Sequence, residues 1–154
     1  MANDEIKNDA MNSGSFHRAK SKAEDYARDP KKAKKLIDEA AQKSEENKGV
    51  LGDVWTYLQA LIRMVKAYYS RSYTQVPWKS LLIGIAGLIY FVSPIDAIFD
   101  YIPVLGLIDD AAVLSAVISA IRYDLNNFIA WESLRDHASR DRALEVPYEE
   151  IKNN

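Results

Sequence analysis

The sequence predicts an all-α fold: a compact bundle of four to five helices, with an apolar helical hairpin around a corner rich in proline and aspartate. Three observations lead to this prediction. Apolar residues recur at three- and four-residue spacing over most of the chain, which is the period of one helix face. No stretch shows the two-residue alternation of a half-buried strand. Proline, glycine and capping residues interrupt the apolar periods where helices would end.

The composition fits one globular domain. The chain has 154 residues, of which 48% are hydrophobic and 27% are charged, close to the average for soluble domains. The lack of cysteine excludes a disulfide framework and thiolate zinc sites. The net charge of −2 gives no support for a nucleic-acid partner, and none is expected.

The predicted domain spans residues 16–145. A disordered polar tail is expected at residues 1–15, which have no apolar period and no hydrophobic segment typical of a signal peptide. A cytoplasmic location is therefore the expectation. A second tail is expected at residues 146–154, where Pro147 would interrupt a helix.

Two helices are expected in the first third of the chain. A weak apolar period covers residues 16–27, and a clearer start follows at Asp29, whose carboxylate can cap free N–H groups ahead of Pro30. Asn47 and Gly49 supply a stop. Small apolar residues predict loose packing of this region. Its outer face is basic, with eight basic and three acidic side chains between residues 16 and 35.

Three further helical segments are expected. An amphipathic pattern runs over residues 50–69 and is broken before Pro77, because the residue preceding a proline is driven out of the helical conformation. The next helix begins near Trp78 and includes thirteen uncharged residues, 80–92. Those thirteen rise about 20 Å, short of the ~30 Å bilayer core, which indicates a buried core helix or a re-entrant segment. A last pattern follows at residues 111–131.

The segment between the last two helices, residues 93–110, is the unusual part of the chain. Ser93 is a suitable N-cap and Pro94 suits the first helical position. Asp96 can then bond back to the Ser93 N–H, as in a capping box. Asp100 lies one turn later on the same face.

The second half of this segment is expected to form a corner. Pro103 should end the short helix, because proline lacks an N–H and clashes with the preceding turn. Gly106 would allow a left-handed turn. Asp109 and Asp110 would then occupy the first turn of the last helix, where the helix dipole favours negative charge.

Two interpretations of the four aspartates remain open. In one they only cap helices and specify the corner. In the other they converge on a divalent cation, which prefers oxygen ligands, or on a basic partner. Gathered in apolar surroundings, the carboxylates would need such a counter-charge. The basic residues expected nearest to this candidate acidic cluster (Asp96, Asp100, Asp109, Asp110) are Arg63, Lys66, Lys79 and Arg122.

The string YFVSPIDAIFDYIPVLGLIDDAAVLSAVI resembles the core motif of the YkvA-like family, small bacterial proteins with a domain of unknown function. Phe99 departs from the motif, which usually has proline before that aspartate. The resemblance spans most of residues 16–135 and implies membrane association without an established activity. The residues at matching positions are Tyr90, Pro94, Asp96, Asp100, Ile102, Pro103, Gly106, Asp109 and Asp110.

No motif predicts catalysis or a cofactor. Phosphate-binding loops and nucleophile elbows are absent from the sequence. The two histidines, His17 and His137, lie far apart in polar surroundings and lack a second histidine at ligand spacing. We therefore expect a non-catalytic protein without a cofactor.

Aromatic residues suggest a role at a membrane. Four of them precede the apolar run together with Arg71 and Lys79, an arrangement typical of a membrane–water boundary. The leading hypothesis is association with the cytoplasmic membrane face, or self-association into a homo-oligomer, through the apolar hairpin. The alternative is a soluble domain whose aspartates bind a divalent cation or a basic partner. The four aromatic residues are Tyr68, Tyr69, Tyr73 and Trp78.

Overall fold

The computed structural model describes the backbone of residues 14–92 and 103–153, and the side chains of residues 17–92 and 111–142. Within these ranges the fold is all-α, as predicted, with seven helices and no strand. There are more helices than the four to five expected, because a short helix precedes α5 and a break at Ile121 divides the last helix. The helices are α2 (Gly14–Arg28), α3 (Pro30–Glu46), α4 (Lys48–Leu51), α5 (Asp53–Tyr69), α6 (Trp78–Val92), α7 (Pro103–Ala120) and α8 (Arg122–Asn153).

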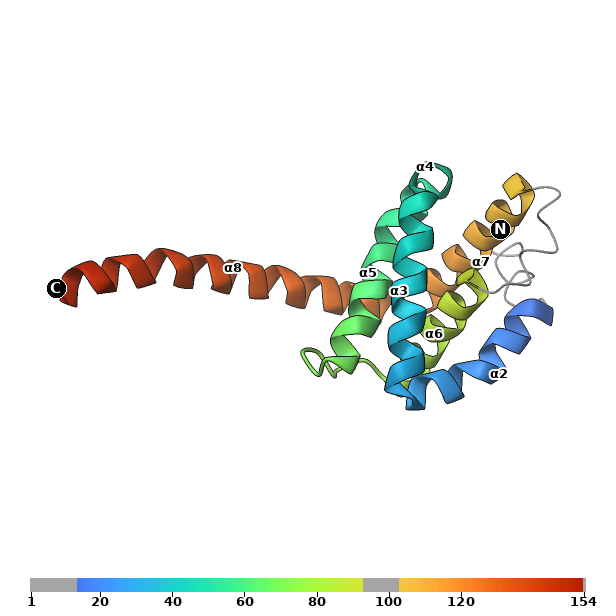
Figure 1. Ribbon diagram of the computed structural model, residues 1–154, viewed down its shortest axis with the longest axis horizontal. Coiled ribbons are helices and arrows are strands. Elements are labelled where there is room, and N and C mark those ends of the chain that lie inside the picture. The colour runs from blue at the N-terminus through green and yellow to red at the C-terminus, as the bar shows by residue number, and fades with distance from the viewer. Residues whose placement is uncertain (1–13, 93–102, 154) are drawn as a thin grey trace.

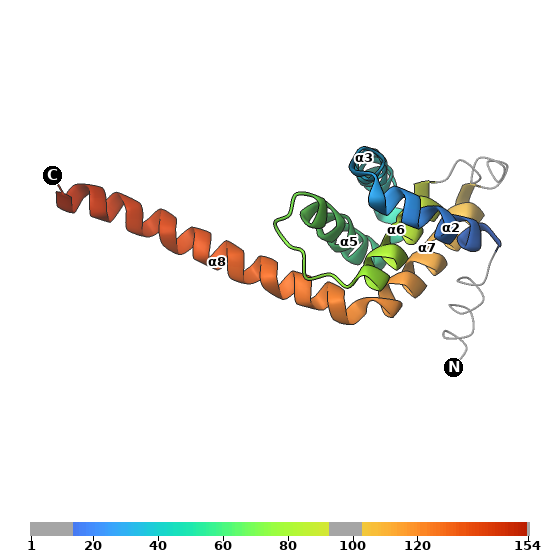
Figure 2. The same ribbon diagram turned by 90° about the horizontal axis from the view of Figure 1, so that it is seen from below.

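Helix α6 lies at the centre of the fold. It contacts α2, α3, α5 and α7, and Figures 1 and 2 show these helices gathered around it. Four of its large side chains are completely buried: Leu81, Ile85, Leu88 and Phe91. The uncharged segment is therefore a buried core helix, one of the two possibilities that its length allowed.

Helix α2 packs closely against α6, so the prediction of loose packing was wrong for this helix. Ala19, Ala23 and Ala27 form its inner face, and Ala23 has no exposed surface. Small side chains allow two helix backbones to approach, because interaxial distance depends on the residues at the contact. Small apolar residues predict loose packing only where no partner helix approaches, and here alanine permits close contact.

The beginning of α3 is as predicted. Asp29 is the N-cap, and its Oδ1 accepts hydrogen bonds from the backbone N–H groups of Lys31 at 3.0 Å and Lys32 at 3.4 Å. These bonds satisfy donors that have no partner within the helix.

Two glycines allow α6 to pack against its neighbours. A Cβ atom added at Gly84 would lie 2.9 Å from Leu61 Cδ1 of α5. One added at Gly87 would lie 3.0 Å from Val117 Cγ1 of α7. Helices α6 and α7 thus pack together as the two arms of the predicted hairpin.

The beginning of α7 differs from the prediction. The helix starts at Pro103 and includes Gly106, so no left-handed turn is observed at the glycine. The short helix that was expected to end at Pro103 falls in residues 93–102, outside the described residues. Proline suits the first position of a helix, where its missing N–H has no partner to lose. Glycine within a helix costs only about 1 kcal/mol relative to alanine. Asp109 and Asp110 consequently lie in the second turn of α7 instead of the first turn of a helix.

Helix α8 is longer than expected and projects away from the other helices (Figure 1). It continues past residue 146 and through Pro147, where a separate tail was predicted. A proline inside a helix removes one hydrogen bond, and this 32-residue helix tolerates that loss.

Candidate functional site

The predicted acidic cluster lies largely outside the described residues. Asp96 and Asp100 fall there, as do the expected caps Ser93 and Pro94. Asp109 and Asp110 belong to the backbone of α7, but their side chains are not among those described. Capping and cation binding therefore both stay predictions. Among the side chains that are described, no group of three or more histidine, aspartate and glutamate residues is placed to hold a metal ion.

Three of the basic residues expected beside these aspartates are at the far helix ends or already paired. Lys79 is in the first turn of α6, whereas the corner follows the other end of that helix, about 20 Å away. Arg122 follows the C-terminal end of α7. Arg63 instead pairs with Glu132 of α8, its Nε and Nη2 lying 2.9 and 3.1 Å from the carboxylate oxygens. The position of a residue in the sequence does not show which ends of neighbouring helices come together, so these candidates could not be ranked from the sequence.

Other lysines lie where α6 ends. Lys43 of α3 donates a hydrogen bond to the Phe91 carbonyl and lies 4.8 Å from the Phe91 ring centroid. A cation is favourable at a helix C-terminus, where carbonyl groups lack partners. Lys22 of α2 and Lys35 of α3 line a hollow beside Val92. No motif in the sequence could have identified these lysines, because they come from helices remote in the chain.

Exposed aromatic and basic side chains occupy the first turns of α6 and α8. The Ser80 hydroxyl donates a hydrogen bond to the Asp124 carboxylate and so joins the first turns of α6 and α8. Close to this bond in sequence, Trp78 is 41% exposed and Tyr123 is 78% exposed. Tyr57 of α5 adds a third exposed aromatic ring, whose centroid lies 5.9 Å from the Arg122 guanidinium. We call the following set the aromatic–basic surface: Tyr57, Trp78, Lys79, Arg122 and Tyr123.

This surface differs from the aromatic group expected from the sequence. Trp78 belongs to both, but Tyr73 is only 6% exposed and packs against Phe128 and Trp131, with ring centroids 5.3 and 5.0 Å away. Tyr68 and Tyr69 are half-buried. Three of the four expected residues are thus core or boundary residues. Tyr123 was missed because it falls within the predicted last helix, away from the apolar run.

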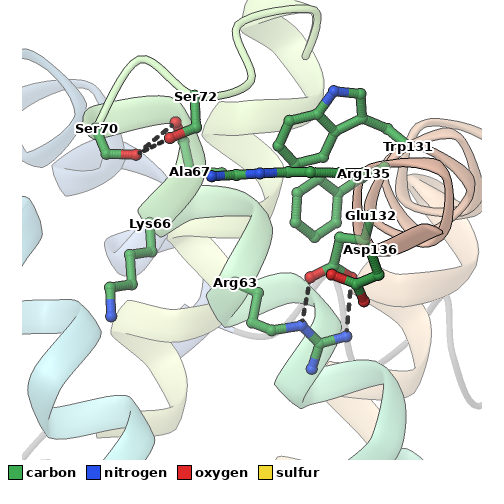
Figure 3. Close-up of a pocket in the computed structure, with 10 residues that line it drawn as sticks. Arg63, Lys66, Ala67, Ser70, Ser72, Trp131, Glu132, Arg135 and Asp136 are labelled. Carbon is green, nitrogen blue, oxygen red and sulfur yellow. Dashed lines mark hydrogen bonds and ion pairs between the residues drawn. The ribbon is translucent and has the colours of Figure 1, made fainter. Parts of the chain in front are cut away.

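An open groove lies between α5 and α8 (Figure 3). Its volume is about 310 Å³. Phe128, Trp131 and Ala67 supply its apolar part. Its polar residues are Arg63, Lys66, Ser70, Ser72, Glu132, Arg135 and Asp136.

None of the described helices is both long enough and apolar enough to cross a bilayer.

Comparisons with known proteins identify a family match in the central part of the chain. A family model described as "Protein of unknown function (DUF1232)" matches residues 80–116, which run from α6 into α7. The protein named "Uncharacterized membrane protein YkvA" of Bacillus subtilis (strain 168) is 33% identical over 92 residues. That alignment covers 60% of this chain and 83% of the Bacillus protein. No solved structure matches the chain.

Proposed function

The chain belongs to the YkvA-like family, and from this premise we propose that it is a non-catalytic protein that associates peripherally with the cytoplasmic face of a membrane. Its contact with the membrane is the aromatic–basic surface. The observation that carries the proposal is the exposure of Trp78 and Tyr123, each next in sequence to an exposed basic residue, on helices joined by the Ser80–Asp124 hydrogen bond.

The chemistry of this surface suits the headgroup region of a bilayer. Tryptophan and tyrosine combine an apolar ring with a polar group, and both are enriched at membrane–water interfaces. Lysine and arginine near an anionic leaflet contribute roughly 1 kcal/mol each. The name of the Bacillus relative, a membrane protein, adds support.

The burial of α6 determines which form of association the proposal takes. Insertion of the α6–α7 hairpin into lipid would require α6 to leave contacts with α2, α3 and α5. Self-association through α6 would require the same rearrangement. Contact through side chains that are already exposed requires none, so we favour peripheral binding over both. The basic side chains of α2 and α3 would add long-range attraction to anionic lipid.

Vesicle co-sedimentation tests the proposal. The full chain should bind vesicles of phosphatidylcholine with phosphatidylglycerol, and bind phosphatidylcholine alone more weakly. Replacing both aromatics, Trp78→Ala with Tyr123→Ala, should weaken binding about tenfold or more, because two apolar rings no longer enter the interface. Leu134→Ala is the matched control, since Leu134 is 71% exposed on α8 but lies outside the aromatic–basic surface.

Two results would contradict the proposal: wild-type protein that stays in the supernatant with anionic vesicles, or a double variant that binds as tightly as Leu134→Ala. Circular dichroism should show that each variant keeps the helix content of the wild type. The melting temperature should change little in Leu134→Ala and should fall in the double variant, because Trp78 is only 41% exposed.

A further inference from the structure

The α5–α8 groove combines an apolar floor with a polar rim. Phe128 is 1% exposed, and Trp131 stacks on it with ring centroids 5.7 Å apart, so the floor is fixed by packing. The Arg135 guanidinium lies 5.2 Å from the Trp131 ring centroid and, in Figure 3, extends from α8 towards α5. A volume near 310 Å³ is at the lower end of the range for small-molecule sites.

The charges of the groove divide into two groups. Arg63 and Glu132 neutralise each other in a two-bond ion pair that also fastens α8 to α5. Lys66 and Arg135 have no carboxylate partner among the described side chains. Asp136 is the remaining acid of the rim. Two cations and one carboxylate are left, which favours an anionic ligand.

The end of α5 forms one edge of the groove. The Ser72 N–H donates to the Ala67 carbonyl at 3.0 Å, and the Arg71 N–H donates to the Tyr68 carbonyl at 3.2 Å, as in a Schellman motif. These bonds occupy carbonyl groups that would otherwise repel an anion. Arg71 has a φ of +62°, a left-handed conformation for which glycine is usual. The hydroxyls of Ser70 and Ser72 lie 2.8 Å apart at this edge.

We infer that this groove binds a small amphiphilic acid. Its apolar body lies against Trp131 and Ala67, above the buried Phe128 ring, and its phosphate or carboxylate lies between Lys66 and Arg135. Charged hydrogen-bond donors are the strongest partners for such oxygens. Arg63 cannot take this role as well as Arg135, because Glu132 already engages two of its donors. The ligand class is independent of the membrane contact proposed above.

Phenyl phosphate is a suitable probe, because it joins an aromatic body to a doubly charged acid. Titration is followed by the indole N–H signal of Trp131 in heteronuclear NMR, assigned with Trp131→Phe. Saturable shifts are expected with phenyl phosphate, and weaker binding with inorganic phosphate or benzyl alcohol, each of which supplies one half of the ligand. Lys66→Gln and Arg135→Gln should each weaken binding about 3- to 10-fold.

Two further variants test the electrostatic basis. Asp136→Asn should tighten binding, because it removes the unpaired acid from the rim. Arg140→Gln changes the same helix outside the groove and should leave affinity unchanged. The inference is overturned if phenyl phosphate causes no saturable shift, or if Lys66→Gln and Arg135→Gln both bind as the wild type does.

The source of the acid is identified by competition. Vesicles of phosphatidic acid that displace phenyl phosphate from the wild type, and do so less effectively from Lys66→Gln, would identify a lipid headgroup. Phenyl phosphate that stays bound in their presence would identify a soluble acid. Both results uphold the site.

Discussion

Tyr69 shows how one side chain joins distant parts of the fold. Its hydroxyl donates a hydrogen bond of 2.6 Å to the Ala27 carbonyl, which links the end of α5 to the last turn of α2. Burial disfavours the charged phenolate and raises the pKa of Tyr69 from 10.0 to about 12, with a smaller contribution from Tyr68. The neutral hydroxyl is therefore the form that the folded state favours.

This link predicts a pH-dependent effect of Tyr69→Phe. Loss of the hydrogen bond should lower the free energy of unfolding by about 0.5–1.5 kcal/mol at neutral pH. A pKa raised on folding contributes stability that is complete below pH 10 and is lost as the pH rises towards 12. The difference in the free energy of unfolding between wild type and variant should therefore be constant up to about pH 10 and should become smaller above it.

Urea unfolding at a series of pH values measures this difference. Tyr123→Phe serves as the control, because Tyr123 is exposed and should show little difference from the wild type at neutral pH. A gap between wild type and Tyr69→Phe that stays the same across pH 10–12 would contradict the assigned role of the hydroxyl.

At the scale of helices, close approach to α6 decides the packing. Gly87→Ala would bring a Cβ within 3.0 to 3.3 Å of three Val117 side-chain atoms. Valine is stiff at χ1 and cannot rotate away. Overpacking costs about 1–3 kcal/mol, of which alanine recovers about 1 kcal/mol through helix propensity. We expect a net loss of about 1 kcal/mol in the free energy of unfolding.

Alanine substitutions at two other glycines serve as comparisons for that prediction. Gly84→Ala should cost less, because the closest atom, Leu61 Cδ1, ends a rotatable side chain. Gly49→Ala has no atom within 4 Å of the added carbon and should be neutral or stabilising. Chemical denaturation gives the three values. If Gly87→Ala proves no worse than Gly49→Ala, α6 and α7 are not in the close contact described.

The helices could be predicted where local chemistry decides their limits. Asp29 caps α3, and Trp78 begins α6 after Pro77, both as the sequence indicated. The partner of a helix could not be predicted in the same way. The alanines of α2 do not reveal that they cover α6, and Lys43 does not reveal that it bonds to Phe91, because both contacts join segments remote in the chain.

The candidate sites were harder to predict than the fold for the same reason. The aromatic–basic surface combines α5, α6 and α8, and the groove combines α5 and α8. Hydrophobic periodicity shows which side of a helix is apolar but not which exposed side chains of separate helices become neighbours. Arg63 therefore appeared as a partner for the aspartates, whereas it pairs with Glu132.

For the whole molecule, the central question is how a chain with a buried apolar helix could be held at a membrane. If the aromatic–basic surface makes the contact, attraction depends partly on exposed charges, and the Debye length falls to about 3 Å in 1 M salt. Membranes from cells expressing the full chain should therefore release part of the protein in high salt. They should release most of it in alkaline carbonate, which strips peripheral proteins but not embedded ones.

The Trp78→Ala and Tyr123→Ala double variant sharpens this prediction. It keeps the basic residues, so its membrane binding should depend more on charge than that of the wild type. The bound double variant should therefore be released at a lower salt concentration than the bound wild type. Wild-type protein that resists both washes would mean that the α6–α7 hairpin enters the lipid, against peripheral binding. Wild-type protein found wholly in the soluble fraction before any wash would contradict membrane association itself.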